Sequence, residues 1–188
     1  MSPARAGHPS LPAKILAIHD ALAGVPHAFG GAIALAYYAE PRATVDIDVN
    51  VFVPVDAATT VLDPLFAIGA DGIAGGEDAV ATVRQDGQVR TFWDRTPIDL
   101  FFAYDPFHDA AKSATATVPF AGETIPILSA AHLAVCKVVF DRPKDWVDIE
   151  AMVAAGTRLD TAEIMRWVGR IAGDEDLRYR RIAALLTR

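Results

Sequence analysis

Two acidic side chains occupy a segment whose pattern is typical of a β-strand. Residues 43–53 alternate β-branched and polar side chains at a period of two, yet positions 46 and 48 are aspartates. Because aspartate is disfavoured in strands, this spacing is informative: Asp46 and Asp48 leave the same face. The opposite face is apolar and is expected in the core, with Val45, Ile47 and Val49.

Such a pair needs a counter-charge, because carboxylates about 5–7 Å apart repel strongly inside a domain. Divalent Mg²⁺ or Mn²⁺ satisfies this need, since it takes carboxylate and phosphate oxygens as ligands. Asp99 repeats the pattern within the short apolar strand Ile98 to Ala103. Three converging carboxylates predict a two-metal phosphoryl or nucleotidyl transfer site, in which Asp99 could also receive a proton. Taken singly, each aspartate is better explained as an edge-strand or turn residue solvated by water.

Upstream residues are candidates for phosphate contacts. Gly30 and Gly31 precede a predicted helix of about ten residues, where backbone N–H groups can receive phosphate oxygens. Thr44, two positions before Asp46, should point its hydroxyl toward the same site. Arg42 could clamp phosphate or pair with an acidic neighbour.

The glycine pair and the aspartate strand together resemble the signature of the nucleotidyltransferase superfamily, and particularly its AbiEii-like branch of bacterial toxin-type enzymes. The resemblance extends to residues 128–149, with Lys137 on one helix and Asp145 and Asp148 on the next, so that it spans residues 29–150. One position departs from the family, which often has serine where this chain has Gly31.

The resemblance implies a role for each matching residue. Metal ligands would be Asp46, Asp48 and Asp99; triphosphate contacts would come from Gly30, Gly31, Arg42, Thr44 and Lys137. An ammonium in the apolar surroundings of Lys137 also needs a partner on physical grounds, unless it snorkels to the surface. Asp145 and Asp148 share a helix face and could orient Lys137 or Lys144.

The implied reaction is metal-dependent transfer of an NMP from a nucleoside triphosphate to an acceptor hydroxyl. Toxin-type relatives imply a tRNA end as acceptor and an antitoxin protein as partner, although a net charge of -7 supports an RNA acceptor poorly. Two alternatives remain open. One is a small-molecule, antibiotic-like adenylyltransferase; the other is a non-catalytic member that binds nucleotide or a protein partner.

Length and composition predict a folded protein with one good core. The order of the predicted strands and helices indicates an α/β (α+β) fold, a mixed β-sheet flanked by helices with a helical C-terminal region, and the resemblance implies that this fold is nucleotidyltransferase-like. The chain has 188 residues, 52% of them hydrophobic. We expect a catalytic core over 1–128 and helices packed on it over 129–188. No apolar run suits a secretory signal or a membrane span, so a cytoplasmic location is expected. Cys136 should be a small buried hydrophobe, and the histidines should have polar or capping roles rather than bind zinc.

Local patterns predict the elements that position these residues. Helices are expected over 12–22, 56–68 with Asp56 as cap, 129–140 with Ser129 as cap, 143–155, from Asp160 onward, and along the arginine-rich tail. Strands are expected over 43–53, 79–84, 88–93 and 98–103, with hairpin turns at 86–87 and 121–122 and a glycine-rich loop over 69–76.

Overall fold

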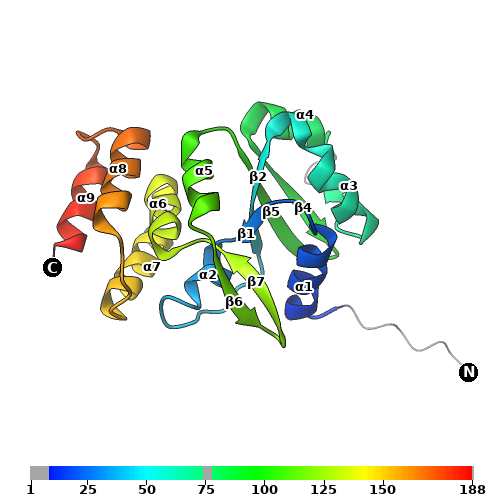
Figure 1. Ribbon diagram of the computed structural model, residues 1–188, viewed down its shortest axis with the longest axis horizontal. Helices are drawn as coiled ribbons and strands as arrows, with labels where there is room; N and C mark the ends of the chain where they lie inside the picture. Colours follow the sequence, from blue (N-terminus) through cyan, green and yellow to red (C-terminus); the bar gives the residue numbers. More distant parts are fainter. Residues whose placement is uncertain (1–8, 74–77, 188) are drawn as a thin grey trace, which may run out of the picture. The chain divides into compact units, whose positions relative to one another are not determined.

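The computed structural model describes residues 9–73 and 78–187 of the chain (Figure 1). Within these residues the strands form one mixed sheet, hydrogen-bonded in the order β3-β4-β5-β2-β1-β7-β6. The ladders β1–β7 and β2–β5 are parallel, whereas β3–β4 and β4–β5 are antiparallel. A mixed sheet with flanking helices confirms the predicted fold class. Part of the predicted glycine-rich loop, residues 74–77, lies outside the described residues.

The elements follow one another in this order: α1 (Leu11–Ala21), β1 (His27–Phe29), α2 (Gly31–Leu35), β2 (Ile47–Pro54), the 3₁₀ turn η1 (Val55–Ala57), α3 (Thr59–Ala67), β3 (Gly72–Ile73), α4 (Ala79–Asp86), β4 (Gln88–Trp93), β5 (Thr96–Ala103), α5 (Pro106–Ser113), β6 (Ala116–Phe120), β7 (Glu123–Ile127), α6 (Ala130–Phe140), α7 (Pro143–Ala154), α8 (Thr161–Ala172) and α9 (Leu177–Leu186). Among the described residues, no helix combines the length and apolar character that a membrane crossing requires.

The chain divides into two compact units. The first contains residues up to 27, 45–104 and 117–125; the second contains 28–44, 105–116 and 126 onward. The boundary at residue 128 expected from the sequence stays a prediction.

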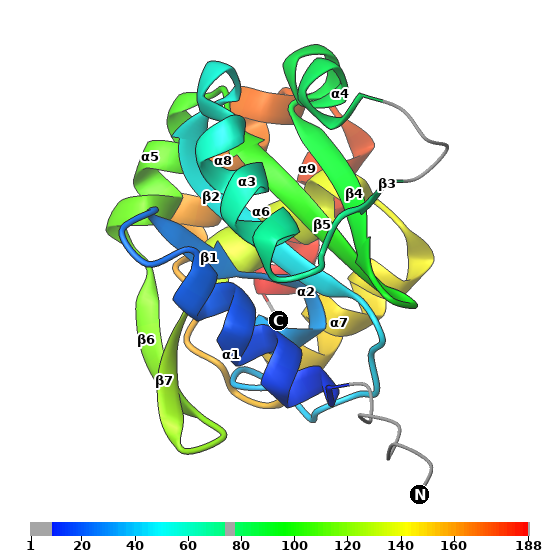
Figure 2. The ribbon, with the colours of Figure 1, turned by 90° about the vertical axis from the view of Figure 1, so that its right-hand side faces the viewer.

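The first unit is built on three neighbouring strands, β4, β5 and β2 (Figure 2). Alternate residues of β5 are buried, namely Ile98, Leu100 and Phe102, and the facing residues of β2, Ile47, Val49 and Val51, are buried with them. The intervening positions of β5 are only half-buried, so that Asp99 lies on the other face of the strand.

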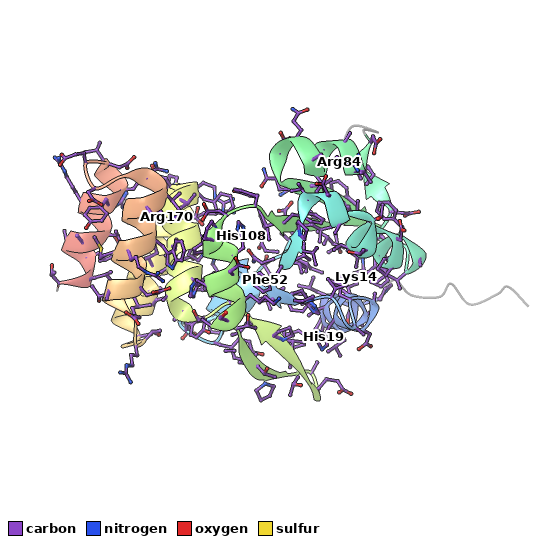
Figure 3. All side chains as sticks on the ribbon, turned by 45° about the horizontal axis from the view of Figure 1, so that its top comes forward. Lys14, His19, Phe52, Arg84, His108 and Arg170 are labelled. Atoms are coloured by element: carbon purple, nitrogen blue, oxygen red, sulfur yellow. The ribbon has the colours of Figure 1, made fainter. Side chains whose placement is uncertain are left out.

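Helix α1 is tied to the turn between β4 and β5 by a buried lysine. Lys14, labelled in Figure 3, is 3% exposed. Its ammonium donates to the carbonyl of Trp93 at 2.8 Å, to Thr96 Oγ1 at 3.0 Å and to Asp94 at 3.1 Å. Three oxygen acceptors offset the cost of burying the charge. This contact fixes the end of the β4–β5 hairpin.

Three predictions for the first unit were wrong. Residues 79–84 are helical rather than extended: Asp78 caps α4 by accepting from Val80 and Ala81, and Gly87, at φ 68°, ends it in the left-handed conformation. The expected hairpin turn at 86–87 is therefore a helix C-terminus. Asp56 caps no helix, because it lies within η1 and α3 begins only at Thr59. The second hairpin turn is confirmed, with positive φ at both residues 121 and 122.

The second unit is mainly helical. The predicted caps are confirmed: Ser129 accepts from the backbone of His132 at the start of α6, and Asp160 accepts from Glu163 at the start of α8. The helices expected over 143–155 and along the arginine-rich tail are confirmed as α7 and α9. Cys136 is half-buried rather than buried.

Candidate active site

The structure brings Asp48 and Asp99 side by side. They are register partners on the parallel strands β2 and β5, which places their backbones about 4.8 Å apart and their side chains on the same face. The side chain of Asp99 is 19% exposed, so it is neither buried nor freely solvated. Two of the three predicted carboxylates therefore meet, although they come from distant parts of the sequence.

Asp46 lies just before the strand rather than within it. The strand begins at Ile47, whose register partner on β5 is Ile98, so Asp46 directly precedes the ladder. Val45 is 71% exposed and does not belong to the core, contrary to expectation. The predicted strand over 43–53 therefore starts later than expected, at Ile47, and the orientation of the Thr44 hydroxyl stays a prediction.

Arg90 is a member of this site that sequence reasoning missed. It is the register partner of Asp99 on the antiparallel strand β4. Its guanidinium donates to both carboxylate oxygens, from Nε to Oδ1 at 2.6 Å and from Nη2 to Oδ2 at 2.7 Å. The sequence did show an arginine and an aspartate in two neighbouring predicted strands. It did not show the register between these strands, which pairs the two residues.

All three aspartates act on Arg90 electrostatically. The hydrogen bonds to Asp99 raise the pKa of Arg90 above its ordinary value; burial opposes this, and the charges of Asp99, Asp46 and Asp48 raise the pKa further. Asp46 is thus close enough to contribute to the field of the site, although it precedes β2. The arrangement is a group of carboxylates with a guanidinium beside them.

The donor chemistry of this group suits a divalent cation, but the side chains are not arranged around one. Carboxylate oxygens are the ligands that Mg²⁺ and Mn²⁺ prefer. Within residues 9–73 and 78–187, however, no group of three or more His, Cys, Asp or Glu side chains is placed to hold a metal ion. Both oxygens of Asp99 accept from Arg90 instead. The metal-binding roles of the three aspartates stay predictions.

The glycine pair lies in the second unit, at the start of a helix that is shorter than expected. Helix α2 covers only Gly31–Leu35, and tighter turns follow it, with the amides of Tyr37 and Tyr38 donating to carbonyls three residues back. Gly31 has φ 50°, a left-handed conformation that explains why this position has no side chain. A contact between these glycines and phosphate stays a prediction.

Lys137 is buried in a charged network of the second unit. Its side chain is 5% exposed and its ammonium donates to Asp148 at 2.6 Å, with Asp145 at 3.7 Å. Arg42 donates to both oxygens of Asp148 at 2.9 and 3.0 Å, and Arg142 binds both oxygens of Asp145 at 2.6 and 3.1 Å. Snorkelling of Lys137 to the surface is therefore wrong. Pairing of Asp145 and Asp148 with Lys137, and of Arg42 with an acidic neighbour, is confirmed.

This network holds Asp148 ionised. Burial by itself would raise the pKa of Asp148, but hydrogen bonds from Arg42 and Lys137 outweigh burial and hold the pKa below its ordinary value. The observed role of Lys137 is to neutralise a buried carboxylate. The phosphate contacts expected for Lys137 and Arg42 stay predictions.

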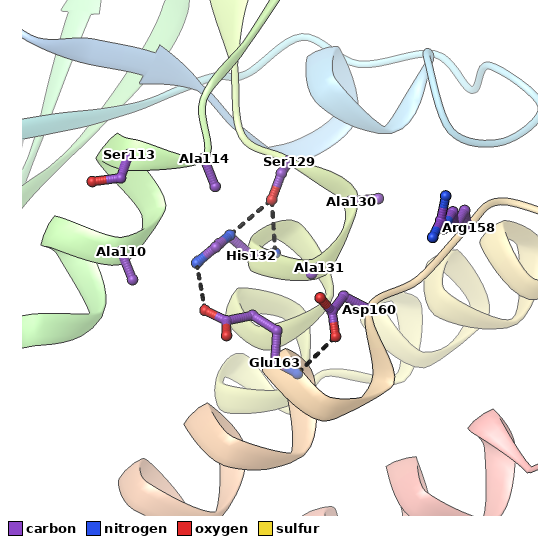
Figure 4. Close-up of a pocket in the computed structure, with 10 residues that line it drawn as sticks. All are labelled: Ala110, Ser113, Ala114, Ser129, Ala130, Ala131, His132, Arg158, Asp160 and Glu163. Atoms are coloured by element: carbon purple, nitrogen blue, oxygen red, sulfur yellow. Dashed lines mark hydrogen bonds and ion pairs between the residues drawn. The ribbon is translucent and has the colours of Figure 1, made fainter.

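The second unit also contains a pocket of about 340 Å³ between α5 and the first turns of α6 and α8 (Figure 4). His132, whose side chain is 3% exposed, lines it and lies between Ser129 Oγ, at 2.7 Å from Nδ1, and Glu163, at 3.5 Å from Nε2. Burial lowers the pKa of His132, and the charge of Glu163 opposes this shift. The polar or capping roles predicted for the histidines are confirmed for His132, which hydrogen-bonds to the cap residue Ser129, and for His108, which completes the capping box of α5.

Comparison with protein-family models gave no match, and neither did comparison with curated proteins. Among solved structures, the chain is similar to the solution structure of the antibiotic-resistance factor ANT(2'')-Ia, with a TM-score of 0.60 at 17% identity, covering 94% of this chain and 95% of that one. A crystal structure of ANT(2'')-Ia with adenylyl-2''-tobramycin gives a TM-score of 0.57 at 16% identity, covering 90% and 95% of the two chains.

A further match is an antigenic nucleotidyltransferase-like protein from Paracoccidioides brasiliensis, with a TM-score of 0.54 at 15% identity, covering 93% of this chain and 89% of that chain. These similarities run over nearly the whole length of each chain. The fold of this chain is therefore the nucleotidyltransferase fold. At such low identity they show the fold and not the reaction.

Proposed function

We propose that this protein is a nucleotidyltransferase that transfers an NMP group from a nucleoside triphosphate to a hydroxyl of a small molecule. The observation that carries the proposal is the in-register pair Asp48 and Asp99 on neighbouring parallel strands of a nucleotidyltransferase fold. Acidic side chains at adjacent strand positions are costly unless they serve a function, because like charges at this spacing repel.

In the proposed reaction, the acceptor oxygen forms a bond to the α-phosphorus and the bond to the pyrophosphate oxygen breaks. The acceptor proton passes to Asp99, whose carboxylate is half-buried and lies beside Asp48. When bound at Asp46, Asp48 and Asp99, Mg²⁺ or Mn²⁺ would supply charge stabilisation for the leaving group and lower the pKa of the acceptor hydroxyl. Lys137 is the proposed structural counter-ion of Asp148 rather than the first contact of the phosphates.

A small-molecule acceptor is favoured over a tRNA end for two reasons. The net charge of -7 opposes binding of a polyanion, which draws on an excess of lysine and arginine. In addition, a match over nearly its whole length, ANT(2'')-Ia, has been solved with adenylyl-2''-tobramycin, a small molecule that carries an adenylyl group. An acceptor with amino groups would suit an acidic protein.

The test is incubation of the full chain with each α-³²P-labelled triphosphate and Mg²⁺, in parallel with a panel of hydroxylated amines and with total bacterial RNA. We expect label in a small-molecule product, and no label with Asp48→Asn or Asp99→Asn. Asp63→Asn, in helix α3, is the matched control and should keep full transfer. Label in RNA would instead support the tRNA-end acceptor that toxin-type enzymes suggest. Absence of transfer, with nucleotide still bound, would support a non-catalytic member of the fold.

A further inference from the structure

The guanidinium of Arg90 binds both carboxylate oxygens of Asp99, the same oxygens that the proposed reaction needs. Strands β4, β5 and β2 lie side by side, and their register places Arg90, Asp99 and Asp48 in one row across the sheet. Side chains at paired positions of neighbouring strands share a face. Arg90 thus approaches Asp99 from the side opposite to Asp48.

The pair has the bidentate geometry that makes arginine–carboxylate contacts strong. Two parallel hydrogen bonds, at 2.6 and 2.7 Å, engage both oxygens of Asp99. The exposed fractions are 48% for the Arg90 side chain and 19% for that of Asp99, so the pair is screened from water on the carboxylate side only. The arginine can leave toward solvent, whereas the aspartate is fixed in the sheet.

A carboxylate held in this way is poorly suited to the proposed chemistry. Both oxygens of Asp99 already accept hydrogen bonds from the guanidinium, so they are not open to a metal ion or to an acceptor hydroxyl while Arg90 stays in place. A divalent cation at the same oxygens would also face a positive guanidinium at close range. Binding of a cation to Asp99 therefore opposes the two hydrogen bonds from Arg90 to the same carboxylate.

We infer that Arg90 and a divalent cation compete for Asp99, so that Arg90 is a positioning residue that keeps Asp99 inactive until a metal ion displaces its guanidinium. The inference rests on the proposed function, because it assigns a purpose to displacement of Arg90. It adds a residue that the family signature of glycines and aspartates does not contain. In the metal-free protein, Arg90 stabilises the carboxylate group; in the metal-bound protein, its side chain turns away.

The test measures binding of Mn²⁺ alone to the full chain, by calorimetry and by the electron paramagnetic resonance of free Mn²⁺. Arg90→Gln removes the guanidinium, and we expect it to tighten Mn²⁺ binding by about tenfold, the equivalent of one charge-assisted hydrogen bond. Arg90→Lys keeps the positive charge but cannot donate two parallel hydrogen bonds, so its affinity for Mn²⁺ should lie between those of the wild type and Arg90→Gln. Arg84→Gln removes a 59%-exposed arginine of the same unit and should bind Mn²⁺ like the wild type.

A second measurement guards against a variant that folds poorly. Without metal, Arg90→Gln should melt below the wild type; with saturating Mn²⁺ its melting temperature should rise more than that of the wild type. Adding Asp99→Asn to Arg90→Gln should abolish the gain in affinity. Equal or weaker Mn²⁺ binding by Arg90→Gln, or no Mn²⁺ binding by any variant, would overturn the inference. These readouts need no nucleotide, so they give an answer even if the nucleotidyl transfer proposal fails.

Discussion

Replacing Asp148 with asparagine tests whether the buried network of the second unit stabilises the fold. The carboxylate accepts from Lys137 at 2.6 Å and from Arg42 at 2.9 and 3.0 Å. After the substitution, Arg42 can turn to water because 40% of its side chain is exposed. Lys137 cannot, since it is 5% exposed and its remaining carboxylate, Asp145, is 3.7 Å away and already bound by Arg142.

Removing one partner of a buried pair typically costs about 3–5 kcal/mol. Because only Lys137 is left buried and poorly paired, we expect a loss at the lower end, about 3 kcal/mol in the free energy of unfolding. For a chain of this length that corresponds to a fall in melting temperature of about 6–12 °C. Urea titration and calorimetry of Asp148→Asn and the wild type at neutral pH measure both quantities.

The matched control is Asp56→Asn, which breaks the pair with Arg84 at 3.6 Å, where the two side chains are 86% and 59% exposed. We expect a change within about 0.5 kcal/mol there. The pair Lys137→Met with Asp148→Leu should recover part of the loss, because an apolar pair has no desolvation cost. If Asp148→Asn were as stable as Asp56→Asn, the network would not be a stabilising core feature and the reasoning would be refuted.

Three further predictions concern other parts of the chain. Asp48→Asn should lower the rate of nucleotidyl transfer by at least about 100-fold while leaving the melting temperature nearly unchanged, which single-turnover assays and calorimetry together would show. Gly87→Ala should cost about 1–2 kcal/mol of unfolding free energy in urea titration, because Gly87 has φ 68° and an added Cβ would lie 2.7 Å from the ring of Tyr104. Burial lowers the pKa of His132, so below about pH 6.5 the unfolded chain gains a proton that the folded chain resists, and stability falls toward acid. His132→Asn should flatten that fall between pH 7.5 and 5.5, and an unchanged slope would contradict the assignment.

Local features of the sequence predicted the second unit well. The caps at Ser129 and Asp160 were recognisable because a capping side chain binds backbone only two or three residues away. The same dependence on local chemistry explains the failure at Asp86-Gly87. A glycine with positive φ serves a hairpin turn and a helix C-terminus equally, and only packing decided that residues 79–86 are helical, with Ala79 and Val83 buried on one side.

Asp48 and Asp99 were predictable as a pair because each is anomalous by itself: an acidic residue in an apolar strand needs a reason to be there. Arg90 was not anomalous, since an arginine on the exposed face of a strand is ordinary. Its importance depends on register, which fixes Asp99 as the residue opposite it. Register is set by pairing across the sheet and by turn geometry, neither of which the sequence of one strand contains.

Asp99 is the residue at which the sequence and the structure lead to different expectations. From the sequence it is a metal ligand and proton acceptor; in the structure both of its oxygens accept from a guanidinium. The two expectations agree if the site has two states, because oxygens that accept hydrogen bonds from arginine cannot at the same time bind a metal ion or an acceptor hydroxyl. The half-exposed side chain of Arg90 makes the second state accessible, since its head can move into water without leaving a buried charge behind. Metal concentration, rather than the presence of the three aspartates, should then decide whether this site is competent for transfer.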